Sequence, residues 1–167
     1  MNSFVCKLKI GERQYGLRKM PPVVAAPFAT RVIKVVSGLL SDPKSAAVLN
    51  QLGDLMKDSE GEKTTDIENK DAIQIGLTIA SLFANIDPDE IDEIFRKAFA
   101  SDVFVNETER LSDESVFHIH FQKYASDYYP VAIWIVWNNV KDFFVNIGDG
   151  MKAVFQSSST RPAPIQK

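Results

Sequence analysis

Cysteine is almost absent from this chain: its 167 residues include only Cys6. One cysteine cannot form an internal disulfide, so the sequence neither requires nor implies an oxidising compartment. Apolar and polar residues alternate around Cys6, from Phe4 to Ile10, which is the pattern of a half-buried strand. We therefore interpret Cys6 as a small core residue and not as a catalytic nucleophile.

Long apolar runs are also missing. The longest, Tyr128–Trp137, has ten residues, which is half of the roughly 20 that a membrane-spanning helix needs. The N-terminal segment alternates apolar and polar residues, so it does not resemble the continuous apolar stretch of a signal peptide. The sequence predicts a soluble, cytoplasmic protein with no membrane partner.

Positive charge is not in excess, because the formal net charge is -3. This argues against binding to the phosphates of a nucleic acid over a broad surface. Catalytic motifs are absent as well: there is no GxSxG, no GxxxxGK[ST] phosphate loop and no GxGxxG. We expect no enzymatic activity, no cofactor and no nucleic-acid partner.

The two histidines, His118 and His120, are the only candidates for metal chemistry. Residues two apart in a strand share a face, so both imidazoles could meet one ion. No Cys, Asp or Glu follows at a spacing that would complete the site. The simpler interpretation is a strand, Val116–Phe121, with both histidines pointing outward, and we expect no metal site. A metal-dependent hydrolase is the enzymatic alternative, and it predicts bound metal in the purified protein.

Hydrophobic spacing predicts a mainly α fold, with about five helices and a small N-terminal β-hairpin. Asp87-Pro88 has the composition of a helix start, because aspartate caps well and proline fits the first helical position. Val103–Val105 and Val116–Phe121 would make a second short strand pair. The inward-facing residues expected in the helices are Phe28, Val32, Val35, Val36 and Leu39; Ala47, Leu49, Leu52, Leu55 and Met56; Ile73, Leu77, Ala80 and Phe83; Ile91, Ile94, Phe95, Ala98 and Phe99; and Ile133, Trp137, Val140, Phe144 and Ile147.

Composition changes sharply at two places along the chain. Between Asp54 and Asp71 seven acidic residues stand against three lysines, so we expect an acidic mobile loop at residues 57–70. Gly148-Asp149-Gly150 is interpreted as a helix stop. Residues 1–155 are expected to form a single globular domain, followed by a disordered C-terminal tail at residues 156–167.

The segment Tyr128–Phe144 contains both tryptophans and is the most distinctive part of the chain. Large aromatic side chains dominate the energetics of cores and of interfaces. Helical spacing places Trp137 on the core face and leaves Trp134 off it, as surplus that a partner could cover. We therefore expect Trp137→Ala to cost more stability than Trp134→Ala. The candidate partner-binding residues are Trp134, Trp137, Asn138, Phe143, Phe144, Phe28 and Val32.

Three features, in this order, resemble the tail assembly chaperones of long-tailed bacteriophages. Tyr15-Gly16-Leu17-Arg18 leads through Pro21-Pro22 to an amphipathic helix ending at Leu40. A helix pair with a D-P-D-E capping turn spans Ala72–Phe99. An aromatic block, Phe117–Phe144, carries a tryptophan, then asparagine, then paired phenylalanines. The resemblance covers roughly residues 3–150.

The resemblance implies a cytoplasmic, mainly helical protein that is not an enzyme. It implies binding to the tape-measure protein, a long and aggregation-prone helical chain, and help in recruiting tail-tube subunits around it. The chaperone would leave before the tail is complete and would be absent from the mature virion. The alternative is a structural tail or head-completion component, which would stay in the particle.

Overall fold

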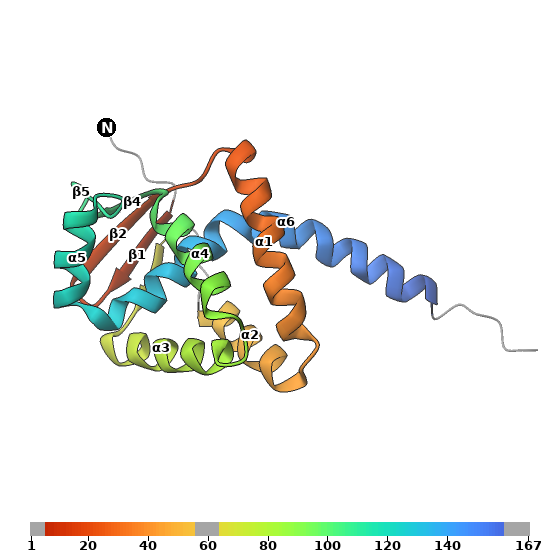
Figure 1. The fold of residues 1–167 in the computed structure, drawn as a ribbon. Coiled ribbons are helices and arrows are strands. Elements are labelled where there is room, and N and C mark those ends of the chain that lie inside the picture. Colours follow the sequence, from red (N-terminus) through yellow and green to blue (C-terminus); the bar gives the residue numbers. More distant parts are fainter. Residues whose placement is uncertain (1–5, 56–63, 159–167) are drawn as a thin grey trace, which may run out of the picture.

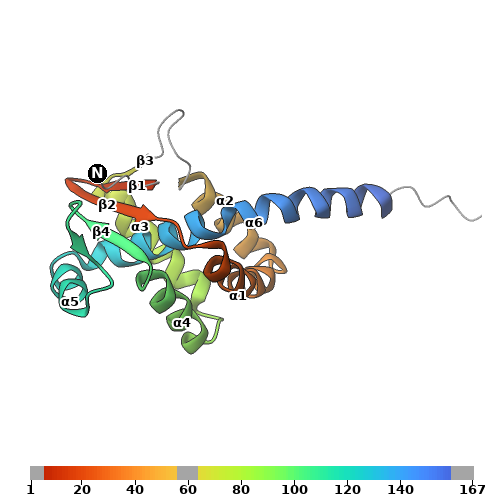
Figure 2. The same ribbon diagram turned by 90° about the horizontal axis from the view of Figure 1, so that it is seen from above.

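The computed structural model describes residues 6–55 and 64–158, with side chains described for residues 6–52 and 64–143. Its strands form one sheet (Figure 1). Seen from above, α3, α5 and α6 lie below one face of that sheet, and α6 continues away from the body (Figure 2). Buried apolar side chains from Cys6 to Val140 form one connected core.

The sheet is larger than the predicted hairpin. The hairpin itself, β1 (Cys6–Ile10) with β2 (Arg13–Arg18), is confirmed as an antiparallel pair. Three further strands extend it in the order β3-β1-β2-β4-β5. They are β3 (Thr64–Ile67), which pairs parallel to β1, β4 (Asp102–Val105), which pairs antiparallel to β2, and β5 (Glu109–Arg110).

The position of β3 corrects the sequence analysis. This strand lies inside the segment predicted to be an acidic loop, and residues 56–63 of that segment lie outside the described residues. Thr65 and Ile67 are buried while Asp66 is exposed, so a short alternation is present within the acidic stretch. Four residues are too few to distinguish a strand from a loop by composition. Pairing with β1 makes this segment a strand.

The sheet has one packed face and one open face. In β1 and β3 buried side chains alternate with exposed or half-buried ones, as a sheet covered on one side requires. In β2 and β4 the alternation is interrupted, because Gly16 and Phe104 are buried as well. The packed face carries Cys6, Leu8, Ile10, Tyr15, Leu17, Thr65, Ile67, Val103 and Val105. The burial of Cys6 confirms its interpretation as a core residue.

Six α-helices occur in the described residues, so the mainly α class is confirmed. They are α1 (Pro22–Leu40), α2 (Pro43–Leu55), α3 (Asn69–Phe83), α4 (Pro88–Phe99), α5 (Glu114–Lys123) and α6 (Tyr128–Ser158), with a 3-10 turn, η1 (Ala125–Asp127), before the last. The predicted start of α4 is confirmed, because the Asp87 carboxylate accepts a hydrogen bond from the Asp89 N–H at 3.0 Å and Pro88 opens the helix.

The predicted strand Val116–Phe121 is wrong, because these residues lie in α5. Asp113 caps this helix and accepts a hydrogen bond from the Ser115 N–H at 2.9 Å. Helical periodicity then brings Phe117 and Phe121 onto one face, with ring centroids 4.9 Å apart. The stretch is both apolar and short, and its hydrophobic spacing alone does not separate strand from helix.

Helix α6 also differs from expectation at its C-terminal end. It continues through Gly148-Asp149-Gly150, which was predicted to stop it, and ends at Ser158. Its first turns are contacted by α1, α3, α4, η1 and β1. Residues 159–167, the greater part of the predicted tail, lie outside the described residues.

Candidate partner-docking surfaces

The aromatic part of α6 lies in the core, but its two tryptophans differ from the prediction in which of them is the more buried. Trp134 is 0% exposed, whereas Trp137 is only partly buried. The predicted division into a core face with Trp137 and a partner face with Trp134 is therefore wrong. The first turns of α6 carry apolar residues on several sides and are contacted by several elements, so hydrophobic spacing alone does not show which side is most deeply buried.

Two buried asparagines follow the tryptophans, and one of them, Asn139, joins α6 to the β2–α1 connection. The Asn139 side chain accepts a hydrogen bond from the Met20 N–H at 2.8 Å and donates one to the Ile135 carbonyl at 2.9 Å. Asn138 donates to the Trp134 carbonyl at 2.9 Å. Both side chains are buried, so they satisfy polar groups inside the protein and are not at a partner-facing edge.

The other predicted partner-binding residues are mostly interior as well. Phe28 and Val32 are buried on the inner side of α1, and Phe143 is partly buried against the core. The side chain of Phe144 lies outside those described. Phe28 also lines a groove beside α1, so of this set it is the residue that a partner could contact there without displacing a helix.

A buried polar network was missed by the sequence analysis. Asp127, 0% exposed, accepts hydrogen bonds from both Arg13 and Tyr15. The distance from Arg13 Nη2 to Asp127 Oδ1 is 2.7 Å, and that from Tyr15 Oη to Asp127 Oδ2 is 2.6 Å. Tyr15 Oη also lies 2.8 Å from His120 Nε2, and Arg13 Nη2 donates to Asn69 Oδ1 at 2.8 Å. These contacts tie β2 to α3, α5 and η1.

The electrostatics of this network match a structural role. Because the single Tyr15 proton is donated to Asp127, Tyr15 Oη must accept from the Nε2–H of His120. Burial, with a further contribution from Asp127, raises the pKa of the Tyr15 hydroxyl far above its ordinary value. Burial also lowers the pKa of His120, so this imidazole stays neutral. Every group is occupied by a partner within the protein, and none faces a cavity as a free acid or base.

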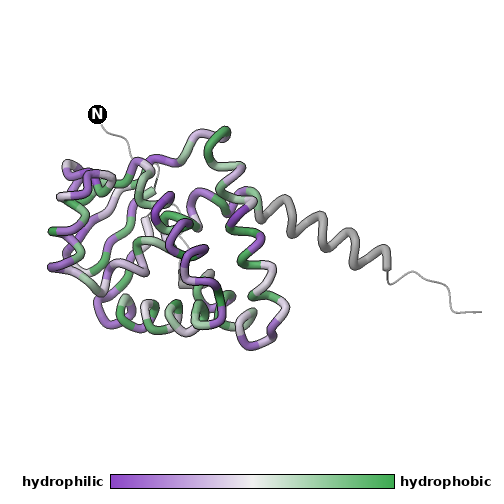
Figure 3. The backbone as a smooth tube through the Cα atoms, in the orientation of Figure 1, coloured by the Kyte–Doolittle hydropathy of each residue, from purple (hydrophilic) through white to green (hydrophobic). Residues whose placement is uncertain are grey.

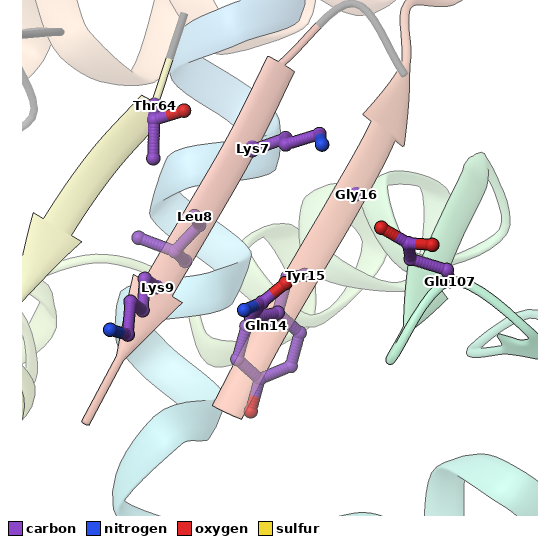
Figure 4. A pocket seen from close by; sticks show the side chains of 8 residues that line it. All are labelled: Lys7, Leu8, Lys9, Gln14, Tyr15, Gly16, Thr64 and Glu107. Carbon is purple, nitrogen blue, oxygen red and sulfur yellow. The ribbon is translucent and has the colours of Figure 1, made fainter. Parts of the chain in front are cut away.

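The open face of the sheet carries a small cavity of about 210 Å³ (Figure 4). Lys7, Lys9 and Gln14 project from β1 and β2 around it, with Glu107 at one side. In the described parts of the chain no group of three or more His, Cys, Asp or Glu residues is placed to hold a metal ion.

Helix α1 presents an apolar surface outward as well as inward. Val23 is 85% exposed and Val24 is 54% exposed in its first turns. Beside them a groove of about 510 Å³ opens between α1 and α4, which we call the α1–α4 groove. It is lined by Arg18, Lys19, Met20, Pro21, Val24, Pro27, Phe28, Lys97, Ala100, Ser101 and Asp102.

Helix α1 is also, within the described ranges, the one helix long and apolar enough to cross a membrane by length and composition. Core helices of soluble proteins satisfy the same test, and in this structure α1 packs against α6, α2 and α4. The absence of a membrane partner stays a prediction.

Helix α3 carries a second exposed apolar surface, on the side that was predicted to face the core. Its buried residues are Ala72, Ile75, Ile79 and Leu82. Of the predicted inward face, Ile73 is 55% exposed, Leu77 is 63% exposed and Ala80 is exposed, while Phe83 is partly buried. Both sides of α3 are apolar, so spacing alone left the choice of face open.

Comparison with protein families identifies a relationship. A family model described as phage tail assembly chaperone protein, TAC, matches residues 11–152. This range includes β2, all of α1 to α5 and most of α6. Searches of curated proteins and of solved structures found no match.

Proposed function

This chain belongs to the phage tail assembly chaperone family, and from that premise we propose that it binds the tape-measure protein and helps recruit tail-tube subunits. The family role is assembly through contacts with other tail proteins and not catalysis. The specific partners and the order of binding are our proposal. It includes action in the host cell during assembly and release before the virion matures.

The observation that carries the proposal is the outer surface of α1. This helix has nineteen residues, of which only Arg31 and Lys34 are charged. A helix that is apolar on all sides is normally buried on all sides. Yet the buried residues of α1 lie on one side and leave its first turns open. An exposed apolar surface of this kind is typical of a protein-binding site.

The α1–α4 groove suits an amphipathic helix, the form in which a helical tape-measure chain exposes apolar surface. Pro21, Val24 and Phe28 offer apolar contacts, and Lys19 and Lys97 lie at the border. Covering a fully exposed valine contributes roughly 1.5–3 kcal/mol. Much of that gain offsets the cost of association, so binding at this groove is reversible, as a chaperone that must leave requires.

Co-expression tests the proposal. The tape-measure protein of the same phage is produced with this chain, and its soluble yield is measured against expression alone. We expect a large increase with the natural chain and little with a Val23→Asp/Val24→Asp variant. Ile119→Asp is the matched control, because Ile119 is an exposed aliphatic residue (69%) on a different helix, α5. It should retain the natural effect.

Particle analysis separates the proposal from its alternative. Purified virions are examined by mass spectrometry for this chain. The proposal predicts its absence from mature particles. Its presence at a fixed copy number, together with no gain in tape-measure solubility, would establish a structural tail or head-completion component instead.

A further inference from the structure

The outward side of α3 forms a narrow apolar stripe, which we call the α3 stripe: Ile73, Gly76, Leu77 and Ala80. These positions follow the i, i+3, i+4, i+7 spacing of one helix face. Residues 72–86 contain no charged residue. The α3 stripe is therefore uncharged, which is unusual for a helix face that is open to solvent. Figure 3 shows the hydrophobic and neutral colours that run along α3 after its first turn.

The shape of the stripe suits another helix. Gly76 leaves a gap between two large aliphatic neighbours, and a Cβ placed on it would meet only Tyr129, at 3.9 Å. Small residues between larger ones allow two helices to approach closely, because the side chains of one enter the spaces of the other. Among the described residues only the Tyr129 ring borders this position, and it leaves room for a Cβ.

The stripe continues into a groove of about 310 Å³ between α3 and α4, which we call the α3–α4 groove. Ala80 belongs to both features, and Tyr129 borders the groove and lies against Gly76. The floor is aromatic, with Phe83 and Phe95 stacked edge to face at 5.8 Å. The groove is lined by Ala80, Phe83, Ala84, Pro88, Ile91, Asp92, Phe95, Tyr128 and Tyr129.

The charge around this surface is predominantly negative. From Glu68 to Lys97 seven acids stand against three bases, and each base is paired with an acid: Lys70 with Glu68 at 3.0 Å, Arg96 with Asp92 at 2.6 Å and Lys97 with Glu93 at 3.6 Å. The acids over this span are Glu68, Asp71, Asp87, Asp89, Glu90, Asp92 and Glu93. Most of them cluster at the start of α4, where the helix dipole favours negative charge. The lining of the α1–α4 groove, in contrast, has more basic than acidic residues: Arg18, Lys19 and Lys97 against Asp102.

We propose that the α3 stripe and the α3–α4 groove form a second docking surface, which binds an amphipathic helix whose apolar face is flanked by lysine or arginine. The apolar face fills the space over Gly76, and the basic flank lies against the acidic start of α4. The inference does not depend on which tail protein the α1–α4 groove binds. It gives the chain two surfaces of different charge, so that two partners can be held at once.

The test uses two fluorescent helical peptides and the full chain. Each peptide has about 18 residues, five helical turns, and an identical leucine and alanine stripe. One is flanked by lysine and the other by glutamate. Fluorescence anisotropy should show the lysine peptide binding at least about tenfold more tightly at low salt. Because 1 M salt shortens the Debye length to roughly 3 Å, the preference should largely disappear there. Equal affinities at low salt overturn the proposal.

Variants locate the site. Ile73→Ser/Leu77→Ser should weaken binding of the lysine peptide about tenfold or more, and Asp89→Lys/Asp92→Lys should remove its preference over the glutamate peptide. Val24→Ser and Ile119→Ser are matched controls with exposed aliphatic residues elsewhere, and both should bind like the natural chain. Circular dichroism checks that each variant is folded. Loss of binding in Val24→Ser, with none in the α3 variant, would assign the peptide to α1 and overturn the inference.

A second copy of this chain is the competing occupant of the stripe. Sedimentation analysis of the natural chain and of Ile73→Ser/Leu77→Ser distinguishes the two. The proposal predicts the same oligomeric state for both proteins. A change to a smaller species in the variant would show self-association through α3 instead. Neither result affects the co-expression test, so failure here and failure of tape-measure binding are separate outcomes.

Discussion

The first turns of α6 and the outer side of α3 both carry apolar residues but have opposite surroundings. Trp134 on α6 has no exposed surface, and Leu77 on α3 is mostly exposed. The aromatic-rich helix is enclosed by four helical elements and a strand. The aliphatic helix has one packed side and one open side. In this protein the concentration of aromatics therefore lies in the core, and the exposed apolar side of α3 is where we propose that a partner binds.

Replacing Trp134 gives the largest effect expected from this comparison. Trp134→Ala removes a fully buried side chain and should lower the free energy of unfolding by about 3–5 kcal/mol. Trp137→Ala, at a partly buried position, should cost less. This order is the reverse of the one predicted from helical spacing. Urea denaturation followed by circular dichroism measures both values, and a larger loss for Trp137→Ala contradicts the burial described for α6.

Trp134→Phe is the matched control for Trp134→Ala, because it leaves a smaller cavity in the core. The Trp134 Nε1–H is buried and has no hydrogen-bond partner among the described residues, so phenylalanine loses volume without losing a hydrogen bond. The cost should fall to about 1–2 kcal/mol. A cost equal to that of Trp134→Ala would mean that the indole N–H, and not packing, provides the stability.

The buried ion pair beside the core should give the second largest effect. Asp127→Asn leaves Arg13 without its carboxylate and disturbs Tyr15, so unfolding should become easier by about 3 kcal/mol. Asp92→Asn breaks an exposed pair with Arg96 and should change stability by less than about 0.5 kcal/mol. Thermal melts of the two variants check the contrast. Similar shifts in both would show that the network of Asp127 is not structural.

Local signals predicted the parts of the fold that depend on nearby residues. The β1–β2 hairpin, the buried face of α1 and the capped start of α4 each follow from residues a few positions apart. The contact of Arg13 with Asp127 joins positions 114 apart, and no pattern in the sequence connects them. The same holds for β3, whose pairing with β1 outweighs its acidic composition.

The exposed surfaces of the helices were harder to predict than the fold. Aromatic content pointed to Trp134, which is buried. The uncharged run at residues 72–86 was visible in the sequence and now coincides with an exposed helix face. The exposed side of α3 was not predicted for a physical reason. The spacing of apolar residues shows which sides of a helix are apolar, but the neighbouring elements decide which of those sides is covered.

His120 should give a smaller, pH-dependent effect at the edge of the packed region. Burial lowers its folded-state pKa, while in the unfolded chain it titrates near its ordinary value of about 6.5. As pH falls below that value, the unfolded state binds the proton more readily, so stability is lost. His120→Gln should keep a donor to Tyr15 and remove this part of the loss. Melts between about pH 7.5 and about pH 5, a range that brackets the ordinary histidine pKa, test this prediction. An unchanged dependence of stability on pH in the variant contradicts the buried, neutral imidazole.

The smallest effect on stability is expected at Leu77, a residue of the α3 stripe whose replacement we expect to weaken binding of a helical partner. Leu77→Ser on the open side of α3 removes little buried surface and should change the free energy of unfolding by no more than about 0.5 kcal/mol. Ile79→Ser, two residues along the same helix, alters a side chain that is 0% exposed and should cost about 3 kcal/mol or more. Both variants remove an aliphatic residue from one helix, so differences in helix propensity largely cancel between them. If Leu77→Ser proves as costly as Ile79→Ser, then Leu77 is covered in solution by the protein itself or by a second copy, and the α3 stripe is not free for a partner.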